Sequence, residues 1–181
     1  MLSKSYSVKS TEVNRILQDI EQNKIGIPEM QRPFVWSTVQ VRDLIDSLYR
    51  GYPIGFIVTW ENPNANLKMG GKSQNKEIII DGQQRITALS AALMGKEIVN
   101  DKYSKERIYI AFNPTTEEFA TRSAAIAKDP KWISDISIFN QPGFNTYKYI
   151  NENCERFGRS GDELTDAIQR LMAIYNSEVG V

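Results

Sequence analysis

The feature that most constrains the fold of this chain is the stretch Glu77–Leu89, which reads Glu-Ile-Ile-Ile-Asp-Gly-Gln-Gln-Arg-Ile-Thr-Ala-Leu. An apolar run typical of a buried strand passes through one Asp-Gly step into an amphipathic helix. A strand that leads directly into a helix begun by glycine leaves free backbone N–H groups at one point, and these suit an anion such as phosphate. The stretch therefore predicts an α/β arrangement with a candidate anion site where the helix begins.

Arg85 falls in the first turn of this helix, where the helix dipole favours negative charge. Either a local carboxylate neutralises Arg85 or an anionic ligand uses it. A purely structural explanation is available, because Asp81 and Gln84 fit a capping box and Asp81 and Arg85 fit an i, i+4 ion pair.

A functional explanation accounts for more of the motif. Glycine lets a ligand approach the backbone, glutamine amides offer donors and acceptors, and arginine can bind phosphate with two hydrogen bonds. Asp81 is the candidate to hold a divalent cation or orient a water molecule, and Asp81 and Arg85 are the candidate catalytic residues. The candidate phosphate or nucleotide ligands in this stretch are Gly82, Gln83, Gln84, Arg85 and Thr87.

Composition narrows the function further. The chain has 181 residues, 41% of them hydrophobic, which predicts a real core and either one domain of ordinary size or one domain and a small appendage. The counts of Lys+Arg and Asp+Glu are both 22, so the formal net charge is zero and a uniformly basic nucleic-acid coat is excluded. A local basic patch stays possible in a neutral chain.

The chain contains no histidine, which removes histidine acid–base catalysis and an HNH-type nuclease centre from it. Its single cysteine, Cys154, excludes a disulfide framework and a cysteine-ligated zinc site, and is expected to be a partly buried small hydrophobe. The start has no signal-peptide pattern, and the longest apolar run is far short of the ~20 residues of a membrane span. We therefore expect a soluble, cytoplasmic protein without membrane contact.

Hydrophobic periodicity predicts most of the remaining elements. The expected helices cover about residues 11–22, a segment capped by Ser37 with its apolar face at Val41, Leu44, Ile45 and Leu48, then 82–94, 144–157 and 162–175. Extended segments are expected at 25–28, at 54–60 with both faces covered, at 77–80, and at 107–112 with a hairpin return over 117–119. Residues 62–76 indicate a long surface loop, and 120–135 carry a weak signal.

The segment Gln31-Arg32-Pro33-Phe34-Val35-Trp36 lies between an extended piece and a capped helix, a usual setting for ligand-binding loops. For Gln31 and Arg32 we favour a role in binding phosphate. For Phe34 and Trp36 we favour burial in the core over stacking on a base.

Three segments together resemble a known family. They are residues 27–36, residues 44–55 and Asp81-Gly82-Gln83-Gln84-Arg85, and they are similar to the N-terminal DGQQR domain of GmrSD-type modification-dependent restriction proteins. The resemblance is good over about residues 10 to 95 and looser elsewhere. It implies a ParB/sulfiredoxin-like α/β (α+β) fold, a small mixed sheet flanked by helices, with a helical C-terminal end. We expect residues 1–119 to form the DGQQR domain and 120–181 an extension of it, cut from a longer chain or ending naturally.

The resemblance also implies nucleoside triphosphate binding and hydrolysis with Mg²⁺, coupled to the sensing of possibly modified DNA. Full-length members carry a C-terminal HNH-type nuclease module, for which this chain has neither the histidines nor the room. We therefore expect a fragment, a subunit of a split system or a stand-alone sensor, with a nuclease module or partner subunit as its partner in the first two cases and no cleavage of DNA by this chain alone.

Two other functions compete with this regulatory nucleotide-binding role. A DNA-binding module without catalysis is the main alternative, although zero net charge disfavours strong non-specific binding. A sulfiredoxin-like phosphotransferase ranks last, because Gln83 and Gln84 stand where that chemistry needs a cysteine.

Overall fold

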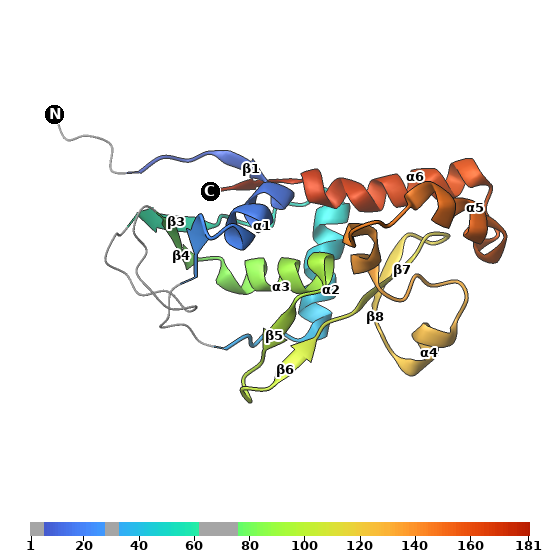
Figure 1. Ribbon diagram of the computed structural model, residues 1–181, viewed down its shortest axis with the longest axis horizontal. Helices are drawn as coiled ribbons and strands as arrows, with labels where there is room; N and C mark the ends of the chain where they lie inside the picture. The colour runs from blue at the N-terminus through green and yellow to red at the C-terminus, as the bar shows by residue number, and fades with distance from the viewer. Residues whose placement is uncertain (1–5, 28–32, 62–75) are drawn as a thin grey trace. The chain divides into compact units, whose positions relative to one another are not determined.

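The computed structural model describes residues 6–27, 33–61 and 76–181, and Figure 1 shows its ribbon. The chain forms two compact units, each assembled from segments that are distant in sequence. Unit 1 comprises Met1–Gln31, Pro53–Gln83 and Tyr175–Val181, and unit 2 comprises Arg32–Tyr52 and Gln84–Ile174. One passage between the units falls inside the Asp81–Arg85 motif, after Gln83. The expected division at residue 119 concerns a different partition and stays a prediction.

Unit 1 is built around a small mixed sheet. Its sheet order is β2-β4-β3, with β2 parallel and β3 antiparallel to β4, and β1 pairs with β9 in a separate antiparallel ladder. The elements are β1 (Ser10–Glu12), α1 (Val13–Glu21), β2 (Ile25–Gly26), β3 (Val58–Glu61), β4 (Glu77–Asp81) and β9 (Glu178–Gly180). The parallel pair is the part that matters for the candidate site, because both of its strands end at the same edge.

The first helix begins later than the sequence predicts. Residues 11 and 12 were expected to be helical, but they belong to β1, which pairs with β9 in the register Thr11↔Val179. Pairing continues outside the strands, because Lys9 and Val181 exchange two backbone hydrogen bonds of 2.9 and 2.8 Å. The competing interaction comes from the other end of the chain, so local periodicity gave no sign of it. The helix itself buries Val13, Ile16 and Leu17 as predicted.

The strand expected over 54–60 is shorter and more exposed than predicted. β3 covers Val58–Glu61, and Phe56, Val58 and Trp60 are 58%, 41% and 55% exposed. The prediction that both faces are covered is therefore wrong. β4 matches its prediction better: it covers Glu77–Asp81 and buries Ile78 and Ile79, whereas Ile80 is exposed at a register shift opposite Val58/Thr59. The loop predicted over 62–76 lies almost wholly outside the described residues.

Unit 2 is mainly helical. Its helices are α2 (Thr38–Tyr49), α3 (Gln83–Met94, whose first residue belongs to unit 1), α4 (Ala124–Lys128), α5 (Thr146–Phe157) and α6 (Gly161–Ala173). A short 3₁₀ turn, η1 (Ile136–Asn140), lies between α4 and α5, and a second, η2 (Ile174–Asn176), follows α6 and belongs mostly to unit 1. Two antiparallel hairpins complete the unit, made by β5 (Glu97–Val99) with β6 (Lys105–Arg107) and by β7 (Ile110–Asn113) with β8 (Glu118–Thr121).

Helix ends agree closely with the sequence. Ser37 caps α2 in a capping box with Gln40, and Gly51 follows that helix with φ +72°. Ser160 and Glu163 form a second capping box at α6, and hydrogen bonds from Ser160 hold the pKa of Glu163 below its ordinary value. The i, i+4 spacing in this helix predicts an ion pair between Arg42 and Asp46, which is wrong: Arg42 pairs with Asp43 at 2.5 Å, while Asp46 pairs with Arg50 at 2.8 Å.

The core of unit 2 gathers behind the β7–β8 hairpin. The rings of Tyr49, Phe112 and Phe119 lie with centroids 4.9 to 5.6 Å apart, and Tyr49 donates a 2.6 Å hydrogen bond to Glu117 Oε2. Glu117 also accepts from Arg170 on α6. The hairpin was predicted, and the alternation expected over 107–112 is found from Arg107 to Ile110 but not further along β7, where all four residues are buried.

The fold class expected from the sequence is confirmed, since the chain is a mixed α+β structure with small sheets. Cys154 is partly buried in α5, as expected. In the part of the chain that the structure describes, no helix is both long and apolar enough to span a membrane.

Candidate anion site at the start of α3

The Asp-Gly step forms a sharp turn between a strand and a helix. β4 ends at Asp81, Gly82 has φ +94°, and α3 begins at Gln83. A side chain is strained at such a φ, so glycine is the residue that this turn requires. Gly82 is buried, while Asp81 beside it is exposed. The turn thus places the first N–H groups of a twelve-residue helix beside an exposed carboxylate.

The predicted ligands that follow in α3 are accessible in part. Gln83, Gln84, Arg85 and Thr87 are half-buried, whereas Ile86, Ala88 and Leu89 are buried in the core. This division is the one expected for a helix that packs with one side and presents the other to a ligand. Asp81 and Arg85 both have interaction partners in the structure, so the structural and functional explanations of Arg85 both stay open.

Gln84 makes a contact that the sequence did not predict. Its side-chain oxygen accepts from the Val35 N–H at 3.0 Å, and its side-chain nitrogen donates to the Pro33 carbonyl at 3.2 Å. A single amide therefore satisfies two backbone groups of a loop fifty residues away in sequence. The contact joins two of the three segments that were singled out from the sequence, because Pro33 and Val35 belong to the Gln31–Trp36 stretch.

Gln83 is used differently. Its side-chain nitrogen donates to the carbonyl of Ile79 at 2.9 Å and thus bonds back to the end of β4. This bond fixes the path of the chain through the Gly82 turn. Of the two glutamines in the motif, one holds the turn and the other holds the partner loop.

The strand directions in unit 1 favour a ligand site at the same edge. β2 and β4 are parallel, with Ile25 opposite Glu77 and Gly26 opposite Ile78. Ligands of α/β proteins bind at the carboxyl ends of parallel strands, and Asp81 lies at that end of β4. The chain after β2 leads towards Gln31 and Arg32, but these two predicted ligands lie outside the described residues.

The aromatic residues beside that segment are placed as expected for Phe34. It is 6% exposed, and its backbone N–H donates to Val99 O at 3.1 Å. Trp36 is half-buried and Val35 is 52% exposed, so only part of the segment packs in the core. Among the described residues, no group of three or more acidic, cysteine or histidine side chains is arranged to hold a metal ion.

The comparison with known families identifies the chain. A sequence model of the GmrSD restriction endonuclease N-terminal domain matches residues 13–179. Because this match covers most of the chain, the chain belongs to that family and is a domain of a restriction system. No curated protein matches the chain. The family resemblance inferred from the three sequence segments is therefore confirmed.

Proposed function

We propose that this domain binds and hydrolyses a nucleoside triphosphate and thereby regulates a DNA-restriction system. The observation that carries the proposal is the Gly82 turn: a glycine with φ +94° opens α3 beside Asp81 and one turn ahead of Arg85. Backbone N–H groups at a helix start together with a guanidinium suit the β- and γ-phosphates of a nucleotide. The double hydrogen bond of Gln84 supports the proposal, since it holds the loop that follows Arg32 against the same helix turn.

Each residue has a distinct part in the proposal. Arg85, with Arg32, neutralises the negative charge that develops on the phosphates during transfer. The N–H groups beyond Gly82 hold the phosphate oxygens, and the amides of Gln31 and Gln83 and the hydroxyl of Thr87 provide further hydrogen bonds. Asp81 orients the attacking water.

The residues present fit a Mg²⁺ ion that arrives with the nucleotide. Mg²⁺ in nucleotide sites is held by one or two carboxylates together with phosphates and water, and does not need a cage of protein ligands. Asp81 is exposed at the end of β4 and is the residue that would hold it. Bound there, Mg²⁺ would supply positive charge to the phosphates.

The first test is thermal melting of the full chain with GTP, ATP or CTP and Mg²⁺. A ligand at a hundredfold excess over its Kd stabilises the folded state by about 2.7 kcal/mol, so a bound nucleotide raises the midpoint measurably. We expect this rise in wild type and its loss in Arg85→Ala. Arg122→Ala, an exposed arginine of unit 2, is the matched control and should keep the rise.

Release of inorganic phosphate separates hydrolysis from binding. Asp81→Asn should keep part of the nucleotide-dependent rise and lose phosphate release. If no nucleotide raises the wild-type midpoint, the proposal is wrong and the capping-box explanation of the motif stands. The main alternative, a DNA-binding domain without catalysis, predicts instead a DNA affinity that falls steeply with salt in the absence of any nucleotide effect.

A further inference from the structure

A long groove runs beside β3 in unit 1, away from the Gly82 turn. It has two hollows of about 770 and 700 Å³, which adjoin each other because Lys9, Glu61, Glu77 and Val181 line both. We call the whole the β3 groove. Its apolar half is lined by Tyr6, Val8, Phe56, Val58 and Trp60, and its charged half by Asp19, Lys24, Glu61 and Lys76.

The apolar half exposes large side chains that a folded protein normally covers. Phe56, Val58 and Trp60 alternate along one segment, so they project on one side of it. Tyr6 and Val8, from the segment before β1, line the same hollow and are 76% and 66% exposed. Contiguous apolar exposure of this kind marks a surface that contacts another molecule.

The backbone of β3 is also open. In the described part of the chain, β3 has a strand neighbour on one side only, because the sheet order is β2-β4-β3. Just before β3, Ile57 donates its N–H to Gly180 O at 2.8 Å, so β9 covers the edge there and ends beside it. From Val58 onward, no other described segment is bonded to the outward backbone groups of β3, which leaves them for an added strand.

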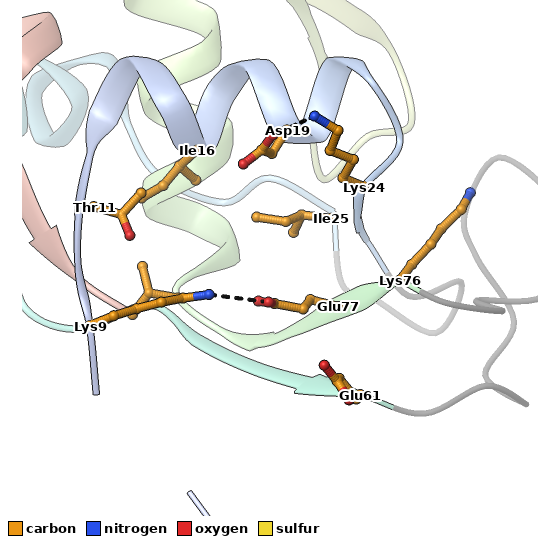
Figure 2. Close-up of a pocket in the computed structure, with 10 residues that line it drawn as sticks. Lys9, Thr11, Ile16, Asp19, Lys24, Ile25, Glu61, Lys76 and Glu77 are labelled. Carbon is orange, nitrogen blue, oxygen red and sulfur yellow. Dashed lines mark hydrogen bonds and ion pairs between the residues drawn. The ribbon is translucent and has the colours of Figure 1, made fainter. Parts of the chain in front are cut away.

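The charged half of the groove contains side chains that could orient an added strand through ion pairs. Figure 2 shows Lys9 reaching Glu77 and Lys24 reaching Asp19, ion pairs of 3.2 and 3.4 Å. Glu61 and Lys76 differ, because neither has an ion-pair partner within the described residues. Among the described residues, this end of the groove thus has one charge of each sign without an ion-pair partner.

We propose that the β3 groove binds an extended polypeptide segment of a partner protein, which adds as a strand to the free edge of β3. The apolar side chains of this segment pack against Phe56, Val58 and Trp60. Further along, it carries charges of both signs that pair with Glu61 and Lys76. Nucleic acid fits less well, because the described residues that line the hollow with the aromatic side chains include the carboxylates of Glu61 and Glu77 and one lysine, Lys9, which is paired with Glu77.

The experiment uses the full chain and a designed probe. Two capped ten-residue peptides alternate valine with threonine and carry arginine and aspartate at one end or the other. Binding is measured by calorimetry, and the site by hydrogen exchange of the amides of residues 58–61. A copy of each peptide with N-methylated backbone keeps the side chains and removes the N–H groups that would pair with β3.

We expect at least one peptide to slow exchange over 58–61 and its N-methylated copy to bind at least about tenfold more weakly. Trp60→Lys should weaken binding by at least about tenfold, since buried aromatic contacts dominate such interfaces. Tyr147→Lys, a change at a 76% exposed aromatic of α5, should leave it unchanged. Val58→Lys repeats the test if Trp60→Lys disturbs folding.

Four results would overturn the proposal. No slowing of exchange with about 1 mM peptide would show that the edge does not accept a strand. Equal binding of the N-methylated copy would exclude backbone pairing. Slowed exchange that depends on protein concentration without peptide would assign the groove to a second copy of this chain. Slowed exchange caused by DNA and not by peptide would assign it to nucleic acid.

Discussion

The side chain of Gln84 and the backbone of Val35 are joined by a 3.0 Å hydrogen bond, and the same amide reaches the Pro33 carbonyl at 3.2 Å. A glutamine amide offers a donor and an acceptor at one end, which no carboxylate or aliphatic side chain can do. The second glutamine of the motif therefore holds a loop, which is a separate role from the ligand contact proposed for it. Replacement of Gln84 should therefore change the stability of the fold even when no ligand is present.

Replacement of Gln84 tests this contact. Gln84→Met keeps the length of the side chain and leaves the two backbone groups without their partner, so we expect a loss of about 1–2 kcal/mol in the free energy of unfolding. Gln84→Glu keeps the acceptor and repels the Pro33 carbonyl, and should cost a similar amount. Urea unfolding measures both. Gln169→Met, at an exposed position of α6, is the control, and an equal loss there would refute the role of the amide contact.

The Gly82 turn gives a second prediction. Gly82→Ala places a side chain at φ +94°, which should lower the free energy of unfolding by about 1–2 kcal/mol. It should also abolish the nucleotide-dependent rise in melting temperature, because the backbone N–H groups move. Gly51→Ala has a similar φ of +72° and open space around the added carbon, so it carries the backbone cost alone. Nucleotide binding that survives in Gly82→Ala would contradict the turn as the phosphate site.

The Tyr49–Glu117 hydrogen bond predicts how stability changes in alkali. Burial, together with the hydrogen bond to Glu117, raises the pKa of Tyr49 from 10.0 to about 12. The unfolded chain then loses this proton first, so the contribution of Tyr49 is complete below pH 10 and is lost as pH rises towards 12. Wild type should lose up to about 1.4 kcal/mol per pH unit more steeply than Tyr49→Phe in this window. Tyr147→Phe should keep the wild-type slope, and identical slopes in all three proteins would refute the prediction.

In acid, Glu117 of the same pair makes stability change with pH in the opposite direction. The Tyr49 hydroxyl is the largest influence that lowers the pKa of Glu117 below its ordinary 4.5, with Arg170 adding to it. The contribution of Glu117 is therefore present above that value and is lost as the pH falls through its depressed pKa. Tyr49→Phe should lose less stability than wild type on acidification, which denaturant unfolding between neutral pH and pH 3 measures.

Gly95, at the end of α3, gives a prediction with a close internal control. A Cβ at this position would lie 2.3 Å from Arg107 Nη2, the atom that binds Asp135 at 3.1 Å and Ser137 at 2.9 Å. Gly95→Ala must therefore displace the guanidinium as well as strain the backbone at φ +65°. Gly158→Ala has φ +61° and nothing near the added carbon. We expect Gly95→Ala to cost at least about 1 kcal/mol more than Gly158→Ala in thermal or urea unfolding.

Local signals account for much of the fold. Ser37 and Gly51 bracket α2, Ser160 begins α6, and Gly95 ends α3, each as its residue type predicts. The failures occur where a distant segment decides. The periodicity predicts a helix at Thr11, whereas Thr11 pairs with Val179 in a strand. No local pattern indicates this pairing, because the partner lies near the other end of the sequence. The apolar sequence of β3 predicts that both of its faces are covered, but one side is exposed. A run of apolar residues does not show whether another element packs on it.

The candidate site was predictable in part for the same reason. The Gly82 turn follows from five adjacent residues, so the sequence located it directly. The Gln84–Val35 contact spans two segments that share no local pattern, and a glutamine at a helix start is explained equally well as a cap. The 3.0 Å hydrogen bond from Val35 shows that Gln84 holds a loop, a role that neither the capping-box explanation nor the ligand-binding explanation includes.

The paired backbone bonds between Lys9 and Val181 bring the two ends of the described chain together. A connection from Val181 to the segment at Lys9 would therefore span only a short distance. A short glycine linker could make this connection, and new ends could be opened at the exposed turn of residues 101–104 without cutting a helix or a strand. A circular permutant of this kind would move the point at which any further polypeptide is attached from the β3 groove to the far end of the β5–β6 hairpin.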